Sequence, residues 1–514
     1  MNASSKERAA IFLLVVVITC LGYWAQVSCF LCEDVTYLLH ATDQWLSGEK
    51  YGIGIFETNP PMILALYSPA YLLAKWTACD ILFSFRLYVI FLILLSVSMS
   101  FFLIKKIVHP SDRLVTYFLS VGWLVILLFL PNVEFGQREH FLSILTSPYL
   151  FLMACRLQNK KVHPLLAALI GLMLGLGVGM KPFFIMLPVL IESYFMLKRR
   201  DFFSWVRIES VVMGMVLLGY IASILLFQPG YFHIILPLVF KFYFPAKVEG
   251  WQAFLGLPSV IFCAGSMTAY FFCYRYDRYF AIGSILWLAL AAMTVAFIIP
   301  RMPWYYHVLP AFSLAFLLVL YGFSQLLSTL ILHASDRPSL YKGCILWLGG
   351  LIIVLFAPLH FFYECCQSLA IFKENEQSFK IAQYLNAQQG EHSVYCFQLS
   401  AIDCFPLVYD THSQYASRFP GWWWYPGLRA TELEHPSSAA LIKDKAYLIR
   451  LVVDDLKQHS PRWVIIDQNR FQETEGNMSF QLVDYLSENP DFRRVWKRYH
   501  YVKSFNGEIL YERY

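Results

Sequence analysis

The feature that most constrains this chain is a series of eleven apolar segments that follow one another along most of its length. A membrane-spanning helix needs about 20 mostly apolar residues, and 58% of the 514 residues are hydrophobic whereas only 15% are charged. So few charges exclude an ordinary soluble protein, and no basic run indicates nucleic-acid binding. The sequence therefore predicts a polytopic α-helical membrane protein. The segments lie near residues 9–28, 84–104, 113–131, 140–155, 163–180, 183–197, 208–227, 251–273, 279–299, 306–328 and 342–362.

The distribution of lysine and arginine predicts the orientation of these helices, because cytoplasmic loops carry an excess of both residues. The apolar stretch 61–78 is short, opens with a Pro-Pro pair and contains Pro69. If this stretch is a helix on the outer surface and the N-terminus is cytoplasmic, every basic cluster falls in a cytoplasmic turn. We therefore predict a first outer loop, 29–83, that contains a surface helix. The basic clusters are Lys105/Lys106/Arg113, Arg156/Lys160/Lys161, Lys198/Arg199/Arg200, Arg275/Arg278 and Arg337/Lys342.

With this orientation, the polar groups that interrupt the apolar pattern all lie at the outer ends of the helices. Ionisable residues close to hydrocarbon are costly and usually functional. Their convergence on one face predicts a functional site there. The groups are Glu33-Asp34, Glu57-Thr-Asn59, Gly136-Gln-Arg138-Glu139-His140, Met180-Lys181-Pro182 and Arg301-Met-Pro-Trp304-Tyr305-Tyr306-His307.

The composition changes near residue 363, which divides the chain into a membrane domain, 1–362, and a C-terminal domain, 363–514. Charged residues become frequent and no long apolar run remains. Helix-like and strand-like stretches alternate, which predicts a small soluble α/β domain. The odd number of preceding spans places this domain outside the cytoplasm. The expected helices are 374–386, 446–458 and 480–488, and the expected strands are 393–399, 463–467 and 509–511.

Two further patterns leave alternatives open. The run Trp422-Trp423-Trp424 is either an aromatic anchor at the membrane surface or a wall that stacks on a sugar or a prenyl group. Three cysteine pairs could form disulfides in an oxidising compartment. They are Cys29/Cys32, Cys365/Cys366 and Cys396/Cys404.

The outer-face groups suit the chemistry of a lipid phosphate. The adjacent carboxylates Glu33 and Asp34 supply a general base that could take a proton from an acceptor hydroxyl. Cations and donors in the other groups suit phosphate, which arginine binds bidentately. The simplest reaction for such a set beside hydrocarbon is sugar transfer from a polyprenyl-phosphate donor, in which the cations stabilise the departing phosphate. The phosphate-binding set is Arg138, Lys181, Arg301 and His307.

Each group also has a structural interpretation when it is taken alone. Glu33-Asp34 fits the solvated start of a loop, and Lys181 fits the residue before a helix-breaking proline. His307, beside two tyrosines, fits interfacial packing. The joint placement of these groups on one face favours the functional interpretation.

A helix followed by an acidic pair, a tyrosine, a Gly-x-x-Tyr turn and a Pro-Pro pair resembles the first outer loop of GT-C superfamily glycosyltransferases. The resemblance is closest to the branch of protein O-mannosyltransferases and of the transferase that adds aminoarabinose to lipid A. The pattern of the family extends over about residues 1–330. Bacterial members also contain motifs similar to Gly136–His140, Lys181-Pro-Phe and Tyr306-His307-Val-Leu-Pro310. The loop motifs are Glu33-Asp34-Val-Thr-Tyr37, Gly48-Glu-Lys-Tyr51 and Phe56-Glu57-Thr-Asn59-Pro60-Pro61.

This resemblance implies an inverting transfer with a carboxylate base, assisted by an acid in the second outer loop. Glu33 stands at the usual Asp and Asp34 at the usual Glu, so the base stays open between these two neighbours. Glu139 or Glu134 matches the second-loop acid. Some relatives use a divalent cation, and Mg²⁺ or Mn²⁺ stays open because no closed ligand set is visible. The residues expected to contact substrate are Glu57, Asn59, Arg138, His140, Lys181, Arg301, Trp304, Tyr305 and His307.

The predicted function is transfer of a sugar from a polyprenyl-phosphate donor to a glycan, lipid or protein acceptor on the outer side of the membrane. The C-terminal domain would shape access of the acceptor. One alternative is a lipid-linked oligosaccharide ligase or polymerase, which uses a diphosphate donor. Another is a transporter or flippase, which places its charges nearer the bilayer midplane. The resemblance favours a bacterial inner membrane, with the N-terminus cytoplasmic and the C-terminal domain periplasmic.

Overall fold

The computed structural model describes residues 5–29, 31–247, 250–332, 377–390, 392–401 and 404–514. The chain divides into two compact units. Residues 31–60 of the predicted first outer loop belong to the same unit as the C-terminal residues, although more than 300 positions of sequence separate them. Unit 1 is Met1–Phe30, Pro61–Ser223 and Glu249–Cys366, and unit 2 is Leu31–Pro60, Ile224–Val248 and Gln367–Tyr514.

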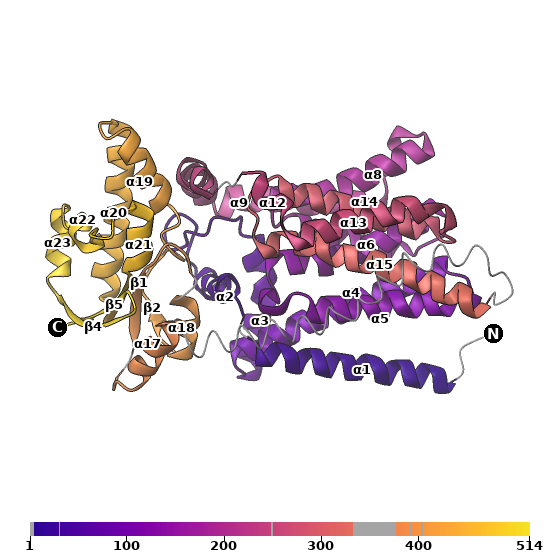
Figure 1. Ribbon diagram of the computed structural model, residues 1–514, viewed down its shortest axis with the longest axis horizontal. Helices are drawn as coiled ribbons and strands as arrows, with labels where there is room; N and C mark the ends of the chain where they lie inside the picture. Colours follow the sequence, from indigo (N-terminus) through magenta and orange to yellow (C-terminus); the bar gives the residue numbers. More distant parts are fainter. Residues whose placement is uncertain (1–4, 30, 248–249, 333–376, 391, 402–403) are drawn as a thin grey trace. The chain divides into compact units, whose positions relative to one another are not determined.

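Unit 1 is a bundle whose long helices run side by side (Figure 1): α6 packs against α4, α5, α14 and α15, and α5 packs against α4 and α15. Small residues allow close helix packing: a Cβ on Gly171 would lie 2.4 Å from the backbone of Glu209, so α7 approaches α9 closely. The helices are α1 (Ser5–Ser28), α3 (Met62–Thr77), α4 (Ile81–Ile107), α5 (Arg113–Phe129), α6 (Arg138–Leu157), α7 (Pro164–Val178), α8 (Met186–Arg199), α9 (Ile208–Phe227), α12 (Gln252–Leu255), α13 (Pro258–Cys273), α14 (Phe280–Ile298) and α15 (Tyr305–Leu332).

The helices confirm the predicted membrane class of the chain. Seven of those that the structure describes are long and apolar enough to cross a membrane. Ten of the eleven predicted spans lie in helices, and the three shorter ones, in α7, α8 and α13, have 14 to 16 residues. The eleventh predicted span, 342–362, lies outside the described residues. The stretch 61–78 forms α3, which has 16 residues and Pro69 inside it, and its location on the outer surface stays a prediction.

Unit 2 contains a five-stranded mixed sheet in the order β2-β1-β3-β5-β4. Strand β1 pairs in parallel with β2 and β3, and β5 pairs antiparallel with β3 and β4. The strands are β1 (Ser393–Phe397), β2 (Gln414–Tyr415), β3 (Trp463–Asp467), β4 (Tyr499–Phe505) and β5 (Glu508–Arg513).

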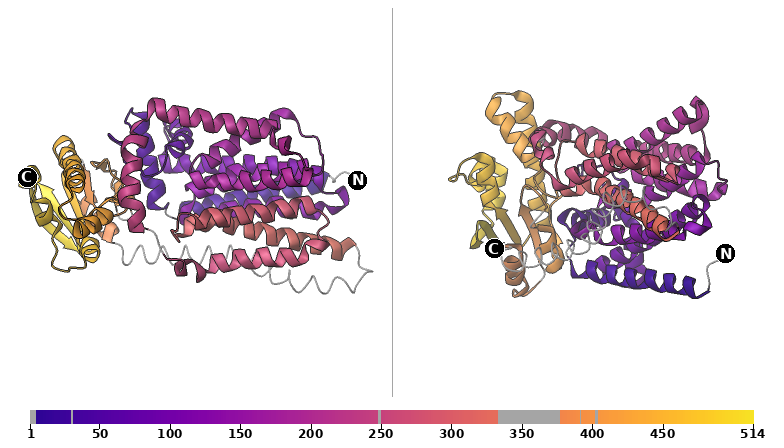
Figure 2. Two further views of the ribbon diagram at one scale, coloured as in Figure 1. Left: turned by 90° about the horizontal axis from the view of Figure 1, so that it is seen from above. Right: turned by 45° about the vertical axis from the view of Figure 1, so that its right-hand side comes forward.

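Helices lie on both faces of this sheet (Figure 2), and aromatic side chains pack these helices against it. On one face, Tyr384 of α17 packs against Trp463, with ring centroids 6.1 Å apart. On the other, Trp496 of α23 packs against Phe397 and Tyr511, at 6.2 and 4.9 Å. The helices of this unit are α2 (Glu33–Leu46), α10 (Leu236–Leu238), α11 (Phe244–Lys247), α17 (Gln377–Asn386), α18 (Cys404–Asp410), α19 (Tyr425–Glu434), α20 (Ala439–His459), α21 (Gln468–Glu475), α22 (Leu482–Leu486) and α23 (Pro490–Trp496).

The tryptophan run lies in the core of unit 2, so both of its predicted roles are wrong. Trp422, Trp423 and Trp424 are at most 5% exposed, which leaves no ring face for a lipid headgroup or a sugar. A disulfide joins Cys396 to Cys404 at 2.04 Å and ties the start of α18 to β1.

The other two predicted cysteine pairs have different outcomes. Cys29 takes part in a disulfide, but Cys32 keeps its thiol, so the pair Cys29/Cys32 does not form. Cys365 and Cys366 lie outside the described residues.

Candidate functional site

The polar turn before α6 is built around a glycine. Gly136 has φ +83°, a conformation that favours glycine, and a Cβ there would lie 2.4 Å from the ring of Phe85. The Tyr67 hydroxyl donates to the Gly136 carbonyl at 2.5 Å. The Gly136 N–H donates to Nδ1 of His140 at 2.9 Å, and Nε2–H of His140 donates to the Leu127 carbonyl at 2.9 Å. His140 therefore uses both ring nitrogens to fix this turn.

A buried ion pair follows the turn. Glu139, in the first turn of α6, is 0% exposed and pairs through Oε1 with the ammonium of Lys181, which is 4% exposed. Lys181 has extended backbone because Pro182 follows it, and it begins the link from α7 to α8. The second carboxylate oxygen of Glu139, Oε2, is buried and has no hydrogen-bond partner among the described residues. The hydrogen bonding of the Glu139 carboxylate is therefore incomplete within the described residues.

His307 of α15 completes a three-helix cluster with this pair. Its Nδ1–H donates to the Met302 carbonyl at 3.0 Å, so in the neutral ring Nε2 carries the lone pair. That Nε2 lies 3.9 Å from Oε1 of Glu139. The charges of Lys181 and Arg138 both act on His307. Arg138, Glu139, Lys181 and His307 thus gather in unit 1, and we call them the open cluster.

Aromatic residues at the start of α15 line this cluster. The Lys181 ammonium lies 5.2 Å from the ring centroid of Tyr306. Trp304 packs against His307 with ring centroids 5.3 Å apart, and the Tyr305 hydroxyl donates to the Leu130 carbonyl at 3.0 Å. Tyr306 was quoted in the sequence motif but was not among the predicted site residues.

Arg301 lies just before α15, at a strained backbone position. Its φ is +54°, in the left-handed region that side chains disfavour. Its guanidinium lies 4.9 Å from the ring centroid of Trp251, which is a cation–π distance. The contact holds Arg301 beside a face of aromatic residues within unit 1.

The acidic pair lies in unit 2, at the N-terminus of α2. Glu33 and Asp34 form the first turn of this helix and are half-buried, where the helix dipole favours negative charge. Cys32, at the N-cap position, makes no side-chain capping bond. The next turn of α2 is buried from Val35 to Leu39, so the helix is anchored behind its two acids.

Glu57 and Asn59 form a self-contained loop in unit 2. The Oε1 atom of Glu57 accepts from the Asn59 backbone N–H at 3.0 Å and from its side-chain amide at 2.7 Å. Glu57 is 5% exposed, and its charge acts on the nearby Tyr231. Asn59 thus holds the Glu57 carboxylate in one orientation.

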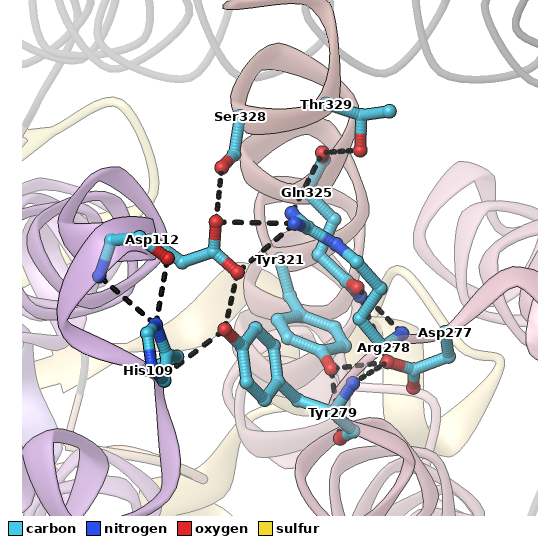
Figure 3. A network of polar contacts seen from close by, with 10 residues as sticks. His109, Asp112, Asp277, Arg278, Tyr279, Tyr321, Gln325, Ser328 and Thr329 are labelled. Atoms are coloured by element: carbon cyan, nitrogen blue, oxygen red, sulfur yellow. Dashed lines mark hydrogen bonds and ion pairs between the residues drawn. The ribbon is translucent and has the colours of Figure 1, made fainter. Parts of the chain in front are cut away.

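Two further charged networks of unit 1 were missed by the sequence analysis. In the first, Asp112 accepts from Arg278, Tyr279 and Ser328, while Asp277 accepts from Tyr270, Tyr321 and Gln325 (Figure 3). In the second, Arg207 bridges Glu192 and Glu209, and Arg156 also binds Glu209. Every carboxylate oxygen in these two networks has a hydrogen-bond partner in the protein, so the networks join helix ends.

An apolar cavity of about 310 Å³ lies between α1, α5 and α15 of unit 1. It includes Leu130, whose carbonyl accepts the Tyr305 hydroxyl. Among the described residues, no group of three or more His, Cys, Asp or Glu could hold a metal ion.

The crystal structure of ArnT from Cupriavidus metallidurans bound to undecaprenyl phosphate matches 99% of this chain and 98% of its own, with TM-score 0.54 and 13% identity. The chain has the fold of ArnT. The apo state of the same protein gives TM-score 0.53 at 14% identity, over 98% of both chains. No family model and no curated protein matches the sequence.

A second neighbour has a lower score. The oligosaccharyltransferase AglB from Archaeoglobus fulgidus, in complex with an inhibitory peptide and a dolichol-phosphate, has TM-score 0.46 and 11% identity over 99% of this chain and 75% of its own. ArnT and AglB are both GT-C superfamily membrane glycosyltransferases. The ArnT match confirms the GT-C fold that the sequence resemblance implied, in an integral membrane protein.

Proposed function

We propose that this protein transfers a sugar from a polyprenyl-phosphate donor to an acceptor on the outer side of a membrane. The support begins with the fold, which matches a structure of ArnT that holds undecaprenyl phosphate over nearly the whole of both chains. Because fold alone does not determine function, the proposal depends on the residues of the open cluster.

The observation that carries the proposal is the buried Glu139–Lys181 pair, in which Oε2 of Glu139 has no hydrogen-bond partner among the described residues. Buried charges are costly unless they are paired and hydrogen-bonded, and a buried polar atom without a partner requires an explanation. A lipid phosphate would lie beside the Lys181 ammonium, and a protonated phosphate oxygen or a sugar hydroxyl would satisfy Oε2 of Glu139. Arg138 and Lys181 are therefore the proposed phosphate ligands, with Glu139 as the group that orients Lys181.

The base of the reaction is proposed on the sequence pattern of Glu33 and Asp34. One carboxylate takes the proton of the acceptor hydroxyl, and the oxygen attacks the anomeric carbon. The bond from that carbon to the phosphate oxygen breaks, and the polyprenyl phosphate leaves with the bonding electrons. A single displacement of this kind inverts the anomeric centre. Cations near the leaving phosphate lower the barrier by stabilising the negative charge that develops there.

Further roles follow from the remaining site residues. Glu57 and Asn59 are proposed sugar contacts, Trp304 and Tyr305 are proposed ring contacts, and Arg301 is a further proposed phosphate contact. His307 would donate to the phosphate from Nε2 when that nitrogen is protonated, and His140 holds the turn that carries Arg138. These assignments keep every predicted site residue in a testable role.

Two observations support the proposed location of donor and acceptor. The apolar cavity between α1, α5 and α15 is suited to part of a prenyl chain, since its described lining is hydrophobic. The Cys396–Cys404 disulfide fits an oxidising compartment such as the periplasm. We therefore propose a bacterial inner membrane protein whose N-terminus is cytoplasmic and whose C-terminal domain is periplasmic.

The test is sugar release from a panel of polyprenyl-phosphate and polyprenyl-diphosphate sugars by membranes that contain the protein. Glu33→Gln and Asp34→Asn are compared with Asp43→Asn, a matched control because Asp43 is an exposed acid on the same helix. Consumption of a monophosphate donor, lost in one of the first two variants and kept in the control, supports the proposal. Consumption of diphosphate donors alone would favour the ligase, and no consumption of any donor would favour a transporter.

A further inference from the structure

The segment Tyr51–Pro60 of unit 2 carries Glu57 and Asn59 and makes its own tight turn. Gly52 has φ +77°, and its N–H donates to the Ile55 carbonyl at 2.9 Å. A Cβ on Gly230 would lie 2.0 Å from the Tyr51 carbonyl oxygen, so the chain after α9 touches this turn directly. The Tyr51 N–H donates to the side chain of Gln228 at 3.0 Å. One side of the segment is thereby fixed.

Arg418 fixes the other side from the C-terminal part of the same unit. Its guanidinium binds Asp455 of α20, with Nε 2.8 Å and Nη2 2.7 Å from Oδ1, and its backbone N–H donates to Oδ2 at 3.1 Å. The remaining nitrogen, Nη1, donates to the Ile53 carbonyl at 2.9 Å. The Arg418 carbonyl accepts the Phe56 N–H at 3.2 Å. One residue therefore links a buried carboxylate to two points of the segment.

The residue directly before Glu57 is held most tightly. Phe56 is 0% exposed, and its ring lies 4.7 Å from that of Phe419. Its carbonyl accepts the indole N–H of Trp423 at 3.0 Å. Because the N–H and the carbonyl of Phe56 are both bound to residues 418–423, the backbone position of Glu57 depends on them.

We infer that Arg418 is a positioning residue that holds segment 51–60 in the conformation that presents Glu57 and Asn59 to the sugar donor. This inference rests on the proposed function and deepens it, because it assigns the C-terminal part of unit 2 a role in donor binding besides access of the acceptor. Arg418 acts through the segment and touches no substrate. Only a guanidinium satisfies Asp455 and the Ile53 carbonyl together, since a lysine offers a single nitrogen.

The expected effect is on donor binding rather than on chemistry. For Arg418→Gln we expect the donor KM to rise at least about tenfold while kcat stays within about threefold, because the proposed base and the phosphate ligands are unchanged. Arg418→Lys should give an intermediate KM, since it keeps the charge opposite Asp455 and loses the bond to Ile53.

The experiment uses the full-length protein in detergent and has two readouts. Amide hydrogen exchange reports the order of segment 51–60, and donor turnover gives KM and kcat. The matched control is Arg462→Gln, because Arg462 also pairs with a carboxylate of unit 2, Glu512, and none of its contacts lie in the segment. The control also shows whether loss of any such pair loosens the unit.

Faster exchange in 51–60 together with a raised KM in Arg418→Gln, and neither change in Arg462→Gln, supports the inference. Unchanged exchange overturns it, and so does faster exchange with an unchanged KM. An equal KM effect in the Arg462→Gln control also overturns it, because the effect would then be general destabilisation. If the parent consumes no donor at all, the proposed function fails and the inference falls with it, which the parent reaction alone reveals.

Discussion

Two charged clusters in unit 1 are made of the same kinds of residue and differ in whether their hydrogen bonds are complete. Around Asp112 and Asp277, each carboxylate oxygen has a partner in the protein, and Arg278 lies against Asp112 (Figure 3). In the open cluster, Oε2 of Glu139 has no partner among the described residues, although its other oxygen pairs with Lys181. Whether every carboxylate oxygen has a hydrogen-bond partner therefore distinguishes the structural cluster around Asp112 and Asp277 from the proposed phosphate site. It does so better than burial or residue composition.

The largest expected effect is at Lys181. Lys181→Met leaves Glu139 buried without its cation, which destabilises a protein by about 3–5 kcal/mol, and it removes a proposed phosphate ligand, so turnover should fall about 100-fold or more. The double variant Glu139→Gln/Lys181→Met removes both charges. It should recover most of the stability, measured by thermal unfolding in detergent, while turnover stays low. Full recovery of turnover in the double variant would show that the Glu139–Lys181 pair is structural. The open cluster would then have the same role as the cluster around Asp112 and Asp277.

The next effect tests whether an unpartnered polar atom is sufficient to mark a site. Nε2 of His40 in α2 is buried without a partner among the described residues, between the rings of Phe405 and Tyr415 at 5.7 and 5.5 Å. Burial lowers the pKa of His40 to about 4 from 6.5. Between pH 4 and pH 6.5, His40 is therefore protonated in the unfolded chain but not in the folded chain. The free energy of unfolding should consequently fall by up to about 3 kcal/mol as the pH drops from about 6.5 to about 4.

The matched variant for this pH effect is His40→Phe, which fits an aromatic surrounding and cannot titrate. In this variant, the decrease in the free energy of unfolding that His40 causes below pH 6.5 should disappear. Donor turnover at pH 7 should stay within about twofold of the parent. Unfolding curves of parent and variant from pH 4 to 7 give the difference. A large loss of turnover at pH 7 in His40→Phe would show that a buried neutral group without a partner can also belong to a functional site. The comparison between the open cluster and the cluster around Asp112 and Asp277 would then have to be revised.

Much of the fold was predictable because hydropathy determines it. Ten predicted spans and the strands β1, β3 and β5 follow from apolar runs in the sequence. Strand β4 was missed because it is an edge strand in which only two of the seven side chains are buried. The Asn506-Gly507 turn that follows it, with positive φ at both residues, is nevertheless a known hairpin signal. The short helices α18, α19, α21 and α23 were missed because they have at most ten residues and little apolar periodicity.

The sequence predicted which residues belong to the candidate site, but it did not predict which of them contact one another. Orientation of the helices brought Glu139, Lys181 and His307 to one end of the bundle, and the structure places these three together. The pairing of Glu139 with Lys181, 42 positions apart, depends on helix packing that no local pattern encodes. The same limit explains why Asp112 was missed and why Arg278 was interpreted only as a cytoplasmic cation, since their pairing spans 166 positions.

The smallest expected effect is at the complete cluster. Asp112→Asn weakens the bonds from Arg278, Tyr279 and Ser328, so unfolding free energy should fall by about 2 kcal/mol. Turnover per folded molecule should stay within about twofold, because no oxygen of this cluster is available to a ligand. Turnover normalised to the folded fraction is the quantity to measure, and a tenfold loss in it would give this cluster a function that its hydrogen bonds do not indicate.

The central claim is that the open cluster binds a lipid phosphate, and binding of undecaprenyl phosphate without a sugar tests it most directly. The affinity of the parent in detergent is compared with that of Glu139→Gln/Lys181→Met and of Asp112→Asn/Arg278→Gln. We predict at least about a tenfold weaker affinity, or about 1.4 kcal/mol, in the first double variant and an affinity within about twofold of the parent in the second. Equal affinities in the parent and in both variants would contradict the assignment of the phosphate to the open cluster.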